Sequence, residues 1–125
     1  KYADLLKKKI EKHDCNVYLV NTGWIGGPYG VGERISIKNT RNCIEAILND
    51  SILNSTFEKN DIFGFDVPVE LENVPSDILN PKKSWINNNI FNYDKYALKL
   101  AEMFKENYKQ YVDAKFTDYS SFGPK

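Results

Sequence analysis

The residues best suited to chemistry lie in residues 21–35, NTGWIGGPYGVGERI, where five glycines and a proline precede a cation. Glycine-rich loops that are followed by Lys and a hydroxyl residue hold nucleotide phosphates in the pattern GxxxxGK[ST]. Gly27 and Gly32 have this spacing, but Glu33 and Arg34 stand where the Lys and the hydroxyl residue are needed. A carboxylate at that position repels phosphate, so the sequence excludes a phosphate loop of this type.

The dinucleotide fingerprint GxGxxG is excluded as well. Gly30 and Gly32 would need Gly or Ala at position 35, which is occupied by Ile35. What remains is a flexible loop that ends at Arg34, shortly before a predicted helix. Spacing alone favours a long surface turn, and a loop that admits a ligand close to its backbone is the alternative.

Composition limits the class of protein. The chain has 125 residues, 42% hydrophobic and 27% charged, which is typical of one small globular domain. Seventeen basic and seventeen acidic residues give no net charge, so there is no electrostatic footprint for nucleic acid or an anionic membrane. No apolar run approaches the ~20 residues of a membrane span. We therefore expect neither nucleic acid nor membrane as a partner.

The remaining reactive side chains form no recognisable site. Cys15 and Cys43 lack metal-binding or redox spacing, so we expect two reduced thiols. His13, the only histidine, falls at the end of a basic helix, where a capping role is expected. The chain opens without Met or a signal peptide, inside a predicted helix, and we expect it to be a portion of a longer protein.

The first third of the chain predicts a helix, a strand, the glycine-rich loop and a second strand. Apolar residues at helical spacing predict a helix over residues 2–12. The unbroken apolar run NVYLV predicts a strand over 16–20 that is covered on both faces. Alternation predicts another strand over 33–37.

A second helix should follow directly. Ser36 or Asn39 can cap it, and it should run to about Asp50. Its predicted buried stripe consists of Cys43, Ile44, Ile47 and Leu48.

The middle of the chain predicts little regular structure beyond one strand. Alternation over 57–71 predicts a half-buried strand, and Pro68 places it at a sheet edge or a strand end. Residues 74–81 predict irregular turns. Residues 82–92 predict a polar connector that is anchored by Trp85.

The clearest element is a long helix over residues 93–112 with one apolar stripe. The stripe consists of Tyr96, Ala97, Leu100, Ala101, Phe104, Tyr108 and Tyr111. Together these elements predict an α/β fold in a single domain.

Longer motifs carry a resemblance. The segment YLVNTGWIGGPYGVGERISIKNTR (18–41), the AIL at 46–48 and VPSDILNP (74–81) occur in this order. Over residues 2–110 the chain closely resembles the C-terminal portion of ATP-dependent phosphoenolpyruvate carboxykinase. The resemblance implies an enzyme that converts oxaloacetate and ATP to phosphoenolpyruvate, CO2 and ADP, in gluconeogenesis and in the cytoplasm.

The family's phosphate loop, metal ligands and oxaloacetate-binding residues all lie upstream of this segment. The resemblance therefore implies no catalytic and no metal-binding residue in this chain, which should be inactive alone. Mg²⁺ or Mn²⁺ would bind to the upstream remainder of the same chain. Residues 1–112 would belong to the nucleotide-binding, catalytic domain, with a mixed sheet and amphipathic helices, and 113–125 would form a loosely ordered tail.

The family's nucleotide contacts transfer to Arg34, Ile35 and Thr40. A guanidinium can stack on adenine, Ile35 offers apolar contact, and Thr40 offers a hydroxyl and a backbone amide. Ile35 could equally be a core residue, and Thr40 could serve only the helix start. Glu33 departs from the family, whose members usually have a non-acidic residue there, and we expect its side chain to point away from the nucleotide.

A function of another class stays open beside the enzyme. The segment could be a stand-alone module that binds a nucleotide or a protein without catalysis. Under the resemblance, the glycine-rich stretch is expected to form the edge of an adenine pocket whose phosphate-binding half lies on the upstream chain.

Overall fold

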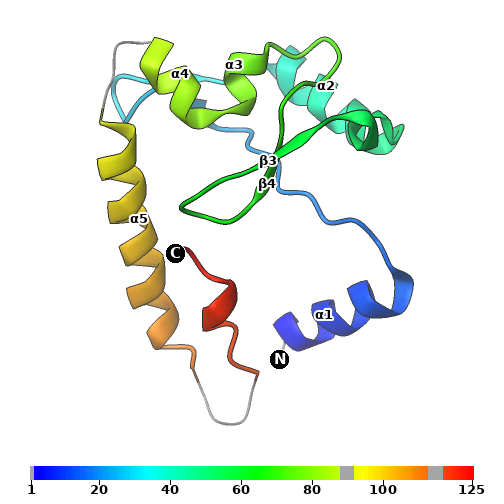
Figure 1. The fold of residues 1–125 in the computed structure, drawn as a ribbon, viewed down its shortest axis with the longest axis vertical. Coiled ribbons are helices and arrows are strands. Elements are labelled where there is room, and N and C mark those ends of the chain that lie inside the picture. The colour runs from blue at the N-terminus through cyan, green and yellow to red at the C-terminus, as the bar shows by residue number, and fades with distance from the viewer. Residues whose placement is uncertain (1, 88–91, 113–116) are drawn as a thin grey trace.

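The computed structural model describes residues 2–87, 92–112 and 117–125, in which five helices, two 3-10 turns and four short strands are found. The strands form two separate antiparallel ribbons, β1 with β2 and β3 with β4. The helices are arranged around the β3–β4 ribbon, with α2, α3 and α4 along one side and α5 and α1 on the others (Figure 1). The predicted mixture of helices and strands is confirmed at this coarse level.

Helix α1 spans Tyr2–His13 and confirms the first predicted helix. The strand predicted over 16–20 is wrong, because these residues have no regular structure. A buried strand needs a neighbouring strand on at least one edge, and among the described residues none pairs with this segment. Its apolar side chains are consequently open to solvent, with Val17 62% and Leu19 78% exposed.

Strand β1 covers Trp24–Ile25 and β2 covers Glu33–Arg34, so the second predicted strand, 33–37, is much shorter than expected. It ends early because Ser36 caps helix α2, Ile37–Leu48. The Ser36 Oγ accepts a hydrogen bond of 3.1 Å from the Asn39 amide. The prediction that Ser36 is a cap is thus confirmed.

The predicted buried stripe of α2 is wrong in half of its members. Ile44 and Leu48 are exposed, Cys43 and Ile47 are half-buried, and the buried residue of the helix is Ala46. Among the described elements the helix contacts chiefly the 3-10 turn η1, Ser51–Asn54, which follows it directly. A stripe at helical spacing is buried only where another layer of structure covers it.

The single strand predicted over 57–71 is a hairpin. Strand β3 spans Phe57–Lys59 and β4 spans Asp66–Pro68. The turn between them forms because the Asn60 Oδ1 accepts hydrogen bonds from the amides of Ile62 (3.1 Å) and Phe63 (2.8 Å). Pro68 does end its strand, as predicted, and pairs with Phe57.

Two short helices replace the predicted turns and connector, namely α3 at Ser76–Leu79 and α4 at Pro81–Asn87. Residues 88–91 of the predicted connector lie outside the described residues. Trp85 is an anchor, as predicted. Its indole lies 5.6 Å from the Tyr93 ring and 5.4 Å from the Tyr96 ring, measured between centroids.

Helix α5 spans Tyr93–Lys109, close to the predicted bounds. Of its predicted stripe only Ala97 and Ala101 are buried, and the larger members are mostly exposed. The described core is accordingly small. It consists of Ile25, Ala46, Ile52, Val74, Ala97 and Ala101.

The last residues return to the beginning of the chain, as Figure 1 shows for the red segment near α1. The Tyr119 hydroxyl donates a 2.8 Å hydrogen bond to the Asp4 Oδ1, and the Tyr119 amide donates to the Tyr108 hydroxyl at 2.8 Å. The Lys125 amide donates to the Ile62 carbonyl, also at 2.8 Å. Residues 113–116 lie outside the described part, and the predicted boundary of a loosely ordered tail stays a prediction.

Candidate functional site

The glycine-rich stretch folds into the β1–β2 ribbon and the loop that closes it. The Pro28 carbonyl accepts hydrogen bonds of 3.0 Å from the amides of Val31 and Gly32. A Cβ on Gly32 would lie only 2.7 Å from the Ile25 carbonyl oxygen and 2.8 Å from that of Gly27. The loop is therefore a compact turn in which glycine is needed at position 32 for steric reasons.

The register of the ribbon decides which side chains share a face. Trp24 pairs with Arg34 and Ile25 with Glu33. The Ile35 amide donates a 2.9 Å hydrogen bond to the Gly23 carbonyl, so the next pair inward, Trp24 and Arg34, is of the non-hydrogen-bonded kind. Side chains of such pairs lie close together on one face of the ribbon.

Glu33 lies on the other face of this ribbon. Successive residues of a strand alternate between faces, so Glu33 shares its face with Ile25, whereas Arg34 shares its face with Trp24. The departure from the family pattern therefore adds a carboxylate to the face opposite to the Arg34 guanidinium.

The three predicted nucleotide contacts lie within seven residues, at the junction of β2 and α2. Arg34 is exposed, and no described residue forms an ion pair with its guanidinium. Ile35 and Thr40 are half-buried. The Thr40 amide donates to the Ser36 carbonyl at 3.0 Å, which leaves the hydroxyl as the polar group of Thr40 that could reach a ligand.

Trp24 was missed as a candidate by the analysis of residue types. Its side chain is 54% exposed, on the same face as Arg34, and its ring meets that of Tyr29 edge-on at 6.5 Å and 64°. Tyr29 itself is 96% exposed. The only sequence signal was the position of Trp24 in the NTGW motif, because pairing with Arg34 depends on a register that spacing does not reveal.

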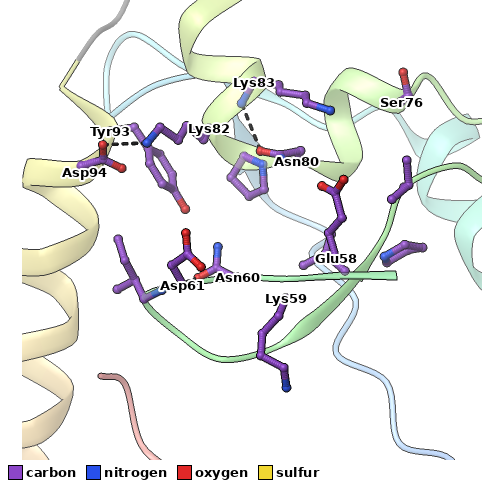
Figure 2. Close-up of a pocket in the computed structure, with 15 residues that line it drawn as sticks. Glu58, Lys59, Asn60, Asp61, Ser76, Asn80, Lys82, Lys83, Tyr93 and Asp94 are labelled. Carbon is purple, nitrogen blue, oxygen red and sulfur yellow. Dashed lines mark hydrogen bonds and ion pairs between the residues drawn. The ribbon is translucent and has the colours of Figure 1, made fainter. Parts of the chain in front are cut away.

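A polar cavity of about 210 Å³ lies elsewhere, between the β3–β4 turn, α3, α4 and the start of α5 (Figure 2). Its charges are partly paired, since the Lys82 Nζ lies 2.7 Å from the Asp94 Oδ2 and this hydrogen bond raises the pKa of Lys82. Burial raises the pKa of Tyr93, which also lines it. None of Arg34, Ile35 and Thr40 lines this cavity.

Other reactive groups give no further site. Burial raises the pKa of the Cys43 thiol, which favours the unreactive protonated form. Among the described residues no three His, Cys, Asp or Glu side chains come together as metal ligands, so this part does not fit the metal that the resemblance implies. In the same part of the chain no helix is both long and apolar enough to cross a bilayer.

Comparison with known proteins decides the family. The family model described as phosphoenolpyruvate carboxykinase matches residues 1–77. The chain belongs to this family.

Curated relatives agree over nearly the whole chain. A protein of Campylobacter jejuni (strain 81-176) named phosphoenolpyruvate carboxykinase (ATP) is 53% identical over 125 residues, which cover 99% of this chain and 24% of that protein. Proteins of the same name from Leptospira biflexa and Thermus thermophilus are 47% and 42% identical over 124 residues, covering 98% and 99% of this chain and 23% of each relative. The chain thus spans about a quarter of the length of the curated carboxykinases it matches.

Proposed function

We propose that this chain is the C-terminal portion of an ATP-dependent phosphoenolpyruvate carboxykinase and supplies the adenine side of its nucleotide site. The complete enzyme would convert oxaloacetate and ATP to phosphoenolpyruvate, CO2 and ADP. The observation that carries the proposal is the 53% identity to a carboxykinase (ATP) over 99% of this chain. Cytoplasmic location, a role in gluconeogenesis and a larger mixed sheet around these elements belong to the same proposal.

The proposed role of the chain is to bind the base, not to perform the reaction. The Arg34 guanidinium is exposed at the end of β2, has no ion-pair partner in the described part, and is free to lie over a flat ring. Ile35 follows it and would contact the base, while the Thr40 hydroxyl would form a hydrogen bond. The catalytic groups, the divalent metal and the oxaloacetate site are assigned to the remainder of the enzyme.

Replacing Arg34 tests this role. In the complete enzyme Arg34→Ala should raise the KM for ATP by about 2- to 30-fold, from a stacking energy of roughly 0.5–2 kcal/mol. The KM for oxaloacetate should change far less, because that substrate has no base. Both constants come from steady-state assays of phosphoenolpyruvate formation.

Lys38→Ala is the matched control, because it removes an exposed positive charge four residues further along the chain, at the start of α2. It should leave both constants close to those of the unmodified enzyme. Equal rises in the two KM values for Arg34→Ala, or the same rise for Lys38→Ala, would argue against a base contact.

A further inference from the structure

We propose that Trp24 is a second residue that contacts the nucleotide base, so that the indole and the Arg34 guanidinium together hold the purine of a nucleoside triphosphate. This inference rests on the proposed function and extends it to a residue outside the three predicted contacts. It is carried by the pairing of Trp24 with Arg34 across the ribbon.

The first argument is position. Because Trp24 and Arg34 form a non-hydrogen-bonded pair, both side chains leave the same face of the ribbon at adjacent points. The backbone beneath them is fixed by the tight turn at Gly32, where a Cβ has no room. The two flat groups are therefore held next to each other by the fold.

The second argument is exposure. Trp24, one of two tryptophans in the chain, is 54% exposed. Where a cation lies over a ring in the described part, it is Lys7 over Tyr119, and the Arg34 guanidinium does not cover the indole of Trp24. The ring of Tyr29 is inclined by 64° to this indole, with 6.5 Å between the centroids, so the two rings are not stacked face to face.

The third argument is chemistry. A purine has two π faces, which stack on aromatic rings and on guanidinium groups alike. Stacking does not depend on the exocyclic groups of the base, so this pair recognises a purine as a class and contributes affinity more than selectivity. The triphosphate would be held elsewhere, since Glu33 and the loop exclude a phosphate loop of the GxxxxGK[ST] type.

The test compares three replacements of Trp24 in the complete enzyme. Trp24→Ala should raise the KM for ATP about tenfold, from the usual contribution of one stacked base, with kcat and the KM for oxaloacetate nearly unchanged. Trp24→Phe keeps a ring face and should stay within about threefold of the unmodified enzyme. Trp24→Leu keeps apolar bulk without a ring and should behave like Trp24→Ala, which separates stacking from packing if the alanine variant fails to fold.

Inorganic tripolyphosphate serves as a probe without a base. Its inhibition constant against ATP should be the same in all three variants and in the unmodified enzyme. Tyr111→Ala is the control variant, because this exposed aromatic residue lies just beyond α5, far along the chain from the ribbon. It should leave every constant unchanged.

The outcomes separate the two proposals. An unchanged KM for ATP in Trp24→Ala, alongside a raised one in Arg34→Ala, overturns the role of Trp24 and leaves the proposed function intact. The KM for ATP could instead rise equally in Trp24→Leu and Trp24→Phe, together with weaker tripolyphosphate inhibition and a lower melting temperature. That result would show that Trp24 packs against the rest of the enzyme, and it would also overturn the proposed role of Trp24. An unmodified enzyme without ATP-dependent turnover overturns the proposed function itself.

Discussion

The two tryptophans of this chain occupy opposite kinds of surroundings. Trp85 on α4 contacts the rings of both Tyr93 and Tyr96 and is half-buried. Trp24 on β1 has one ring beside it, that of Tyr29, and more than half of its surface is open. Of the two, Trp85 is the one that its own chain covers more fully.

This difference indicates what each region does. At the α4–α5 junction the rings of Trp85, Tyr93 and Tyr96 contact one another, and Lys82 is paired with Asp94 beside the polar cavity. On the β1–β2 ribbon Trp24 and Arg34 are paired across the strands, and more than half of the indole surface is open in this chain. Trp85 is covered by its own chain, whereas Trp24 is left for a ligand, as proposed above, or for the remainder of the carboxykinase.

The largest expected effect comes from making the same replacement in both places. Trp85→Ala should lower the free energy of unfolding by about 2–4 kcal/mol, because it removes a large, partly buried ring from two aromatic contacts. Trp24→Ala should change it by less than about 1 kcal/mol, as is usual for an exposed position. Urea unfolding followed by circular dichroism measures the free energy of unfolding of each variant. If both variants lost the same free energy, the distinction between the two regions would be wrong.

A smaller effect is expected from the turn that supports the open region. Gly32→Ala should cost about 1–3 kcal/mol, because its Cβ would meet two backbone carbonyl oxygens that cannot move aside independently. Gly23→Ala is the matched control, since a Cβ there lies 3.4 Å from the Asn21 side chain, an ordinary contact. If unfolding measurements gave both variants the same stability, the turn would not be the rigid support described above.

Sequence patterns predicted the elements that depend on local interactions. The bounds of α1 and α5 and the cap at Ser36 follow from helical spacing and from one side chain's bond to a nearby amide. The strand over 16–20 and the single strand over 57–71 were wrong, because a strand is defined by its neighbours and by turns. The Asn60 turn, in particular, converts an alternating run into a hairpin.

For the candidate site too, the sequence predicted residues that belong to a local motif but not those that depend on a neighbouring strand. The motif identified Arg34, Ile35 and Thr40 as candidates through the family resemblance, and their contact with a nucleotide stays a prediction. Trp24 could not be found from spacing, since its importance comes from the residue across the ribbon. The half-exposed stripe of α5 has a similar cause, because periodicity shows which face is apolar but not whether anything covers it.

The smallest expected effect concerns the bond between the two ends of the chain and depends on pH. The hydrogen bond from Tyr119 lowers the pKa of Asp4, and the same bond raises the pKa of Tyr119. Its contribution to stability is therefore full between about pH 4 and pH 10, is lost as pH falls and Asp4 becomes protonated, and is lost again as pH rises and Tyr119 ionises.

Tyr119→Phe removes the hydroxyl and should abolish this part of the pH dependence. The drop in melting temperature between pH 7 and pH 3 should be smaller for Tyr119→Phe than for the unmodified chain, while Tyr111→Phe, at an exposed tyrosine, should match the unmodified chain. An identical drop in all three would show that the bond contributes nothing.

The bond between Asp4 and Tyr119 also has a consequence for the order of events during protein synthesis. The two residues are separated by 115 positions, and a ribosome that adds about 5–20 residues per second needs on the order of ten seconds to reach the second after the first. During that interval the Tyr119 hydroxyl is not yet available to Asp4. Any contact that holds α1 in place during this interval must therefore come from residues other than Tyr119.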